Sequence, residues 1–222
     1  MPYSIIIPVY NEISKLRILL NELEEYSNNG HQILIINDGS NDGSINILKK
    51  NLFIDLINLK KNYGKGVALK VGLFKSKNKK IIIFDGDLEL ETKNIYKLMK
   101  LDKTVGIHSQ MGNRFLSLNP IKSSYDWGNF IFTVYFNFFN STNHKDILCC
   151  AKSFYKSDVQ LKYLKSTGFD IDLELSSYLS INSRGKRIDQ VSLNYKRRSK
   201  NDGKKLRISD GWHILKRLLV IC

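Results

Sequence analysis

The sequence predicts an α/β fold in which helices flank a mostly parallel central sheet. Short runs of large apolar residues recur along the first hundred residues without polar alternation, as in strands buried on both faces. A polar loop and a stretch of helical apolar spacing follow most of these runs. With 222 residues, the chain can bury a sizeable core in one domain. Strand–helix alternation with short loops is typical of a doubly wound sheet.

Two strand–helix units open the chain. The first predicted strand begins at Ser4 and ends at Pro8, and an amphipathic helix follows, with apolar residues at helical spacing (Leu16, Leu19, Leu20 and Leu23). The second strand is the apolar run at residues 33–36. A polar loop rich in Asp, Asn, Gly and Ser leads from it into a helix that begins near Ser44, and Asp42 or Asn41 can cap this helix.

Two more strands complete the predicted parallel sheet. The third spans residues 53–59 and leads through a glycine-containing loop into a helix with apolar residues at 67, 69, 71 and 73. The fourth strand, residues 81–84, stops at Asp85-Gly86-Asp87. Two carboxylates at a strand end suit a divalent cation such as Mg²⁺ or Mn²⁺, which prefers oxygen ligands and shares them with substrate phosphates. A solvated turn is the alternative, since Asp and Gly are common turn residues.

The motifs IIIPVYNE, INDGSNDGS, NYGKGVALKVGL and FDGDLE, in this order and spacing, resemble glycosyltransferase family 2. The closest resemblance is to the branch of dolichol-phosphate mannose synthases and polyprenyl-phosphate sugar transferases. It continues through residues 168–175 and 195–198 and is weakest at residues 119–139. It implies a GT-A nucleotide-diphospho-sugar transferase fold in a single domain over residues 1–222. Within that domain it implies a nucleotide-sugar-binding half (1–118), an acceptor-binding half (119–205) and a C-terminal helix (206–222).

The resemblance implies donor-binding roles near the ends of the first three strands. Residues expected to line the nucleotide pocket after the first strand are Pro8, Tyr10 and Glu12. Tyr10 would lie near the base or, alternatively, pack in the core. Asp38 matches the family carboxylate that hydrogen-bonds the nucleobase, whereas Asn37 replaces a second acid that many members have. Lys65 would approach the donor between two glycines that could equally be turn residues.

For the metal site, Asp85 and Asp87 resemble the family's metal-binding pair and would act in catalysis. The implied cofactor is Mg²⁺ or Mn²⁺, which offsets charge on the departing nucleoside diphosphate. Glu89 stands where polyprenyl-phosphate transferases often have Gln and could be a third ligand. Gly86 would let the donor or the metal approach the backbone closely.

Two arginines are expected to hold an acceptor phosphate. Arg114 follows a strand, and in the similar branch this arginine lies near the acceptor phosphate; a surface role is the alternative. Arg198 closes the segment Tyr195–Arg198. Asp146 aligns with a further family segment in which Lys152 replaces the usual Arg and loses its planar, forked donor set.

Asp170 and Asp172 have two interpretations. They could cap the N-terminus of a helix that begins around Leu173, where carboxylates are favourable. One of them could instead be the general base that deprotonates a sugar hydroxyl. A lipid-phosphate acceptor would need no base, because its oxygen is already anionic.

The charge distribution favours an anionic surface as a partner. The net charge is +14, and residues 184–207 contain ten Lys and Arg against two acids. Anionic membranes attract such clusters. Nucleic acid is the weaker candidate, because no nucleic-acid motif or aromatic platform accompanies the basic residues. The alternative is a solvated basic surface without a binding partner.

Other features predict a protein on the cytoplasmic face of a membrane. The three cysteines, Cys149, Cys150 and Cys222, fit a reducing cytosol. No signal peptide or stretch of about 18 apolar residues is seen. The terminal segment at residues 208–221 could form an interfacial helix or pack on the sheet.

The sequence therefore predicts an inverting, metal-dependent glycosyltransferase. Its donor would be a nucleotide-diphospho-sugar and its acceptor a polyprenyl phosphate. One alternative is transfer to a sugar hydroxyl of a cell-surface glycan with Asp170 or Asp172 as the base. Another is a catalytically silent, basic binding protein on the same scaffold, although the intact Asp85 and Asp87 argue against it.

Overall fold

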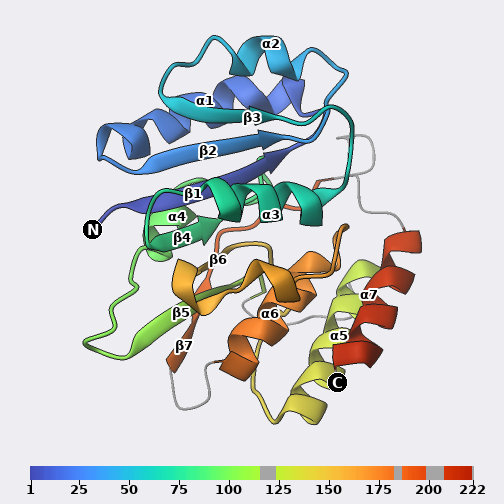
Figure 1. Cartoon of the computed structure of the whole chain (residues 1–222). Helices are drawn as coiled ribbons and strands as arrows, with labels where there is room; N and C mark the ends of the chain where they lie inside the picture. Colours follow the sequence, from blue (N-terminus) through green and yellow to red (C-terminus); the bar gives the residue numbers. More distant parts are fainter. Residues whose placement is uncertain (116–123, 183–186, 199–207, 222) are drawn as a thin grey trace.

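The computed structural model describes residues 1–115, 124–182, 187–198 and 208–221 (Figure 1). Strands and helices alternate along the first hundred residues, as predicted. The elements, in chain order, are β1 (Tyr3–Val9), α1 (Ile13–Asn28), β2 (Gln32–Asn37), α2 (Ser44–Leu48), β3 (Ile54–Asn58), α3 (Lys65–Lys75), β4 (Lys80–Ile83), α4 (Asn94–Lys97), β5 (Ile107–Asn113), α5 (Ser124–Asn140), β6 (Lys152–Tyr155), the 3₁₀ turns η1 (Lys156–Asp158) and η2 (Leu161–Tyr163), α6 (Ile171–Asn182), β7 (Arg187–Ser192) and α7 (Ile208–Ile221).

The described strands form one sheet in the order β3-β2-β1-β4-β6-β5-β7. The four predicted strands are parallel neighbours, so the carboxyl ends of β1, β2 and β4 meet at one edge. The sequence did not predict β6, which enters antiparallel between β4 and β5; β7 then adds parallel to β5. The prediction of a mostly parallel α/β sheet is confirmed.

Helices cover both faces of this sheet (Figure 1). On β1, Ile5 and Ile7 face a core completed by α1, whereas Ile6 faces a second core that includes residues of α3 and α6. All three isoleucines are fully buried. The unbroken apolar runs in the sequence therefore reflect strands that are covered on both sides.

A third cluster lies among the helices at the side of the sheet. Phe136 of α5 and Leu173 of α6 pack with Ile214 and Leu218 of α7. The predicted C-terminal helix is present, but it packs on α5 and α6 rather than on the sheet. Within the described ranges, no helix combines the length and the apolarity needed to cross a bilayer.

Asp42 connects the starts of two helices. One carboxylate oxygen accepts a hydrogen bond from the Ser44 N–H (2.9 Å), and the other accepts one from the Ile13 N–H (2.9 Å). The predicted N-cap at Asp42 or Asn41 is wrong, because the N-cap position of α2 is Gly43, which has positive φ and no side chain to cap with. The polar loop after β2 therefore also fixes the beginning of α1 beside the end of β1.

Candidate active site

A large pocket opens at the carboxyl ends of β1 and β4, where open α/β sheets bind ligands. Its volume is about 770 Å³. Of the sequence-predicted site residues, it contains all but Asp170; the lining includes Pro8, Tyr10, Glu12, Asp38, Lys65, Asp85, Asp87, Glu89, Arg114, Asp172 and Arg198. The fold thus gathers into one pocket residues that lie up to 190 positions apart in the chain.

Asp38 is anchored by the backbone of the loop before α3. Its carboxylate accepts hydrogen bonds from the N–H groups of Tyr63 (2.8 Å) and Gly64 (2.9 Å), and the residue is only 3% exposed. Asn37, in contrast, bonds to Asn58 and Ser40 and is not among the residues lining the pocket. Only Asp38 of this pair can meet a ligand, which agrees with the sequence-based preference for it.

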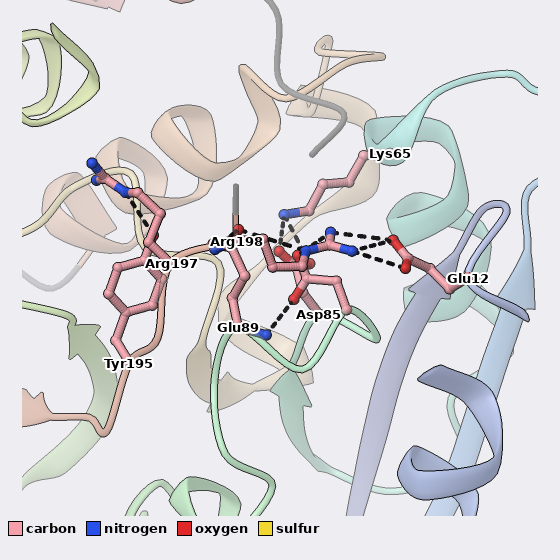
Figure 2. A network of polar contacts seen from close by, with 8 residues as sticks. Glu12, Lys65, Asp85, Glu89, Tyr195, Arg197 and Arg198 are labelled. Carbon is pink, nitrogen blue, oxygen red and sulfur yellow. Dashed lines mark hydrogen bonds and ion pairs between the residues drawn. The ribbon is translucent and has the colours of Figure 1, made fainter. Parts of the chain in front are cut away.

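Arg198 lies among three carboxylates (Figure 2). Its guanidinium is 3.0 Å from Glu12 Oε2, 2.9 Å from Asp87 Oδ2 and 3.7 Å from Glu89 Oε1. The Arg198 side chain is 11% exposed. Burial raises the pKa of Asp87, while the positive charge of Arg198 opposes that rise. The arginine predicted to bind a phosphate is therefore paired with the predicted metal ligands.

Lys65 forms a second cationic centre in the same pocket (Figure 2). Its Nζ lies 2.9 Å from Asp85 Oδ1 and 2.8 Å from Asp172 Oδ2, and its side chain is 9% exposed. Burial alone would lower the pKa of Lys65, but the carboxylates of Asp172 and Asp85 outweigh it and raise that pKa well above its ordinary value. Lys65 therefore stays charged at neutral pH.

The glycines around Lys65 are required by close backbone approach. Gly64 has a φ of +95°, and a Cβ there would lie 2.4 Å from the Thr167 carbonyl oxygen. The Gly66 N–H donates to the same oxygen (2.8 Å). These contacts lock the start of α3 against the loop before α6, which brings Lys65 to Asp172.

Gly86 has a packing role that the sequence did not indicate. A Cβ at this position would lie 3.0 Å from side-chain atoms of both Ile7 and Val9. The glycine between the two acids therefore packs tightly on the core under the pocket. This packing explains the glycine without the close approach of donor or metal that the sequence analysis expected.

Arg114 is held by Asp146 in a buried, forked ion pair. Its Nε and Nη2 lie 2.8 and 2.9 Å from the two carboxylate oxygens of Asp146, and Asn129 Nδ2 donates to the same carboxylate. Burial would raise the pKa of Asp146, but Arg114 outweighs it and holds that pKa below its ordinary value. Lys152 is fully buried, and its ammonium donates to the Cys149 carbonyl. It stands at the position of the usual Arg but is occupied within the core.

Asp170 and Asp172 have different surroundings. Both lie at the predicted N-terminus of α6, yet only Asp172 lines the main pocket. Asp170 instead pairs with Arg217 of α7 at 3.3 Å and accepts a hydrogen bond from the Gly168 N–H. Of the two candidate bases, only Asp172 is placed to meet a ligand in this pocket.

Sequence reasoning missed a polar face of α5. Asp126, Asn129 and Thr133 are buried on this helix, and Asp126 pairs with Arg197. Asn129 also lines the pocket. The missed signal is the i, i+3, i+7 spacing of these residues within an otherwise apolar and aromatic stretch.

Part of the predicted basic cluster lies outside the described residues, including the lysines at 200, 204 and 205. The same holds for Cys222 and for the expected boundaries of the two halves at residues 118–119 and 205–206. Within the described part, Arg187 pairs with Asp189, Arg197 with Asp126 of α5, and Arg198 with Glu12 of the pocket. These arginines are therefore not free surface charges.

Known proteins share sequence motifs and fold with this chain. The family model described as glycosyl transferase family 2 matches residues 4–160. The chain belongs to glycosyltransferase family 2. The resemblance predicted from the motifs is thereby confirmed.

Partial relatives of this family 2 chain include lipid-phosphate sugar transferases. It is 35% identical over 107 residues to the undecaprenyl-phosphate 4-deoxy-4-formamido-L-arabinose transferase of Pseudomonas savastanoi pv. phaseolicola, over 44% of this chain and 32% of that protein. It is 28% identical over 111 residues to the human dolichyl-phosphate beta-glucosyltransferase, over 44% of this chain and 34% of that protein. The match spans about a third of the length of these curated relatives.

Solved structures confirm the GT-A fold. Glucosyl-3-phosphoglycerate synthase of Mycobacterium tuberculosis superposes with a TM-score of 0.76 at 13% identity, over 100% of this chain and 80% of that chain. The same enzyme with Mn²⁺, UDP and glucosyl-3-phosphoglycerate gives 0.73 at 12% identity, over 100% and 80%. TarS of Staphylococcus aureus with UDP-GlcNAc gives 0.66 at 14% identity, over 100% and 66%.

Proposed function

We propose that this chain is an inverting glycosyltransferase that transfers a sugar from a nucleoside-diphosphate sugar to the phosphate oxygen of a polyprenyl phosphate. The observation that carries the proposal is the single pocket that combines Asp38, the pair Asp85 and Asp87, and two buried basic side chains in a family 2 chain. In this proposal residues 1–118 bind the donor, residues 119–205 the acceptor, and the helix after residue 206 closes the domain.

Donor binding is assigned to the strand ends. Asp38 would accept a hydrogen bond from the nucleobase, because backbone N–H groups already fix its orientation. Pro8, Tyr10 and Glu12 would line the same region from the end of β1. That two structural neighbours were solved with UDP or UDP-GlcNAc supports a nucleoside diphosphate as the ligand.

The donor set of the pocket suits Mg²⁺ or Mn²⁺ held by Asp85 and Asp87, with Glu89 beside them. Within the part of the chain that the structure describes, no group of three or more such side chains could hold an ion by itself. Magnesium commonly takes one or two carboxylates and completes its shell with substrate phosphates and water. When bound, the ion would offset negative charge on the leaving diphosphate. Lys65 and Arg198 neutralise these carboxylates in the metal-free protein.

The acceptor phosphate is assigned to Arg198 and Arg114. Arg198 lies beside Asp87 in the pocket, and its planar guanidinium suits a forked contact with a phosphate. Arg114 keeps a face toward the pocket while Asp146 holds it. The names of two partial relatives, which act on undecaprenyl and dolichyl phosphate, support a lipid phosphate.

An anionic membrane surface is the proposed location of such an acceptor. Exposed apolar residues follow one face of α5 at spacings of three or four: Trp127, Ile131, Val134 and Phe138. The neighbouring α7 adds exposed residues, namely Trp212, Leu219 and Val220. Neighbouring exposed apolar residues mark interaction surfaces. The net charge of +14 complements anionic lipid. This placement would correspond to a peripheral protein on the cytoplasmic face.

The alternative acceptor is a sugar hydroxyl with Asp172 as the base, because Asp172 lines the pocket. Rates with polyprenyl phosphate and with a free glycan, each with a matched donor, separate the two. With a lipid phosphate, Arg198→Ala should raise the acceptor KM or lower turnover strongly, whereas Asp172→Asn should leave kcat at saturating donor nearly unchanged. Loss of a general base would instead lower kcat by about 10²–10⁴-fold.

The control for this comparison is Arg187→Ala, which removes an exposed arginine outside the pocket. If Asp172→Asn abolishes turnover on every accepted substrate while Arg198→Ala retains it, the acceptor is not a lipid phosphate. If the wild-type protein neither transfers nor hydrolyses any nucleotide sugar, the silent binding protein becomes the better description.

A further inference from the structure

Asp172 has one carboxylate oxygen that lacks a partner inside the pocket. Its Oδ2 is 2.8 Å from Lys65 Nζ, whereas its Oδ1 is buried without a hydrogen-bond partner among the described residues. The side chain is 8% exposed and lines the pocket. Buried polar atoms are nearly always hydrogen-bonded in folded proteins. Oδ1 is therefore placed to accept a hydrogen bond from a molecule in the pocket.

The chemistry of that donor is restricted by Lys65. The Lys65 ammonium donates to Oδ2, so Oδ1 is the Asp172 oxygen left to accept a hydrogen bond. A phosphate group is mostly ionised at neutral pH, so it is a poor hydrogen-bond donor to a carboxylate oxygen. A hydroxyl group, in contrast, can donate to Oδ1 while the second oxygen stays on Lys65.

The position of Asp172 points to the sugar of the donor. The same ammonium contacts Asp85, which is assigned to the diphosphate end of the donor. In a nucleoside-diphosphate sugar the sugar is bonded directly to the second phosphate, so a group beside the phosphate site meets the sugar next. Asp172 reaches this point from α6, across the pocket from β1 and β4.

We propose that Asp172 accepts a hydrogen bond from a hydroxyl of the donor sugar and so determines which sugar is bound. Lys65 is the positioning residue that holds the Asp172 carboxylate through its Oδ2. This inference rests on the proposed function, because it assumes a nucleotide-sugar donor in the pocket. It gives Asp172 a role in donor specificity that does not require proton transfer.

Calorimetric titration with Mn²⁺ present tests the role of Asp172. The probes are UDP, GDP, UDP-glucose, UDP-N-acetylglucosamine and GDP-mannose, followed by deoxy analogues of the sugar nucleotide that binds best, each lacking one sugar hydroxyl. For the wild type, one deoxy analogue should bind about tenfold or more weakly than its parent, as expected for a hydrogen bond to a charged group. In Asp172→Ala this difference should vanish, while the Kd of the nucleoside diphosphate alone stays unchanged.

The matched control is Asp55→Asn, which alters a carboxylate paired with Lys77 on the surface, outside the pocket. It should retain the full discrimination of the wild type. The unchanged affinity of Asp172→Ala for the nucleoside diphosphate also serves as its folding control, because Lys65 keeps Asp85 as a partner.

The positioning role of Lys65 is tested by coupling. Lys65→Met should reduce the discrimination between the sugar nucleotide and its deoxy analogue, whereas Lys77→Met at the surface pair should not. In the double variant Lys65→Met/Asp172→Ala, discrimination should be no lower than in Asp172→Ala, because Lys65 acts through Asp172. The double variant has one fewer unpaired carboxylate than Lys65→Met, so it is the fallback if the single variant does not fold.

Three results would overturn the inference. The wild type could bind every deoxy analogue as well as the parent, or Asp172→Ala could keep the discrimination. Asp172→Ala could also weaken the nucleoside diphosphate and the sugar nucleotide equally, which would assign the residue to the phosphate end. If the wild type binds none of the nucleotides, the proposed function itself fails and the inference falls with it.

Discussion

Replacing Arg198 with alanine should destabilise the metal-free protein and increase its response to metal. Arg198 is the cation shared by Glu12, Asp87 and Glu89, whose side chains are 8%, 23% and 15% exposed. Removing one partner of a buried ion pair typically costs about 3–5 kcal/mol. Because two of these carboxylates keep partial solvent contact, we expect a loss near the lower end, about 3 kcal/mol.

For a domain of this size, each kcal/mol shifts Tm by about 2–4 °C, so Arg198→Ala should melt about 6–12 °C below the wild type in chelator. Added Mn²⁺ should narrow this gap. The arginine no longer competes for Asp87, and a ligand that binds only the folded state stabilises it by mass action. Thermal unfolding with EDTA and with a Mn²⁺ titration measures both effects.

Arg187→Ala is the matched control, because Arg187 pairs with Asp189 with a side chain 68% exposed. An exposed pair contributes about 1 kcal/mol at most, so this variant should melt close to the wild type and respond normally to Mn²⁺. Equal melting of the two variants, or a gap for Arg198→Ala that Mn²⁺ leaves unchanged, would refute the assignment of Arg198 and a metal ion to the same carboxylates.

Three further predictions follow from the site and its surroundings. Asp87→Asn should abolish transfer and keep a native circular dichroism spectrum, because it would remove a charged ligand of the proposed metal ion at the pocket rather than a residue of the core. Full turnover of the wild type in chelator would contradict the proposed metal. Cosedimentation with anionic vesicles should decrease as salt shortens the Debye length from about 30 Å at 0.01 M to about 8 Å at 0.15 M. Phe138→Ser should weaken vesicle binding further. Vesicle binding that does not depend on lipid charge or salt would count against a membrane surface. Burial, with a smaller effect of Lys152, lowers the pKa of His144 to about 4, so its contribution to stability should be complete above about pH 6.5 and be lost as the pH falls toward 4, by up to about 1.4 kcal/mol per unit. Urea unfolding of His144→Gln should show a flatter pH profile over this window, and identical profiles would assign the titration to another group.

Much of the donor side could be predicted from local sequence. The apolar runs at residues 33–36 and 81–84 are strands because both faces are covered, and parallel strands bring Asp38 and Asp85 to one edge. The starts of α2 and α3 follow from Asp42 and from the glycines at 64 and 66. These features depend on neighbouring residues, which periodicity and turn chemistry report directly.

The other half was less predictable. The strand β6 runs antiparallel between β4 and β5. It has only four residues, too few for an apolar pattern that would predict a strand or its direction. The helix α5 was missed because the resemblance is weakest at residues 119–139, and its buried polar residues Asp126 and Asn129 interrupt a simple apolar face. A side chain's direction on an isolated helix depends on what the rest of the fold places beside it.

The sequence by itself determined the family, the α/β class and the identity of the acids at the strand ends. Only the tertiary structure decided how those acids are neutralised. Lys65 meets Asp172 across 107 positions, and Arg198 meets Glu12 across 186. Such pairs carry no local signal, because an ion pair forms wherever the topology brings opposite charges within about 4 Å in a poorly solvated pocket. Arg198, which was expected to hold the acceptor phosphate, and Lys65, which was expected to approach the donor, are therefore both paired with carboxylates of the pocket.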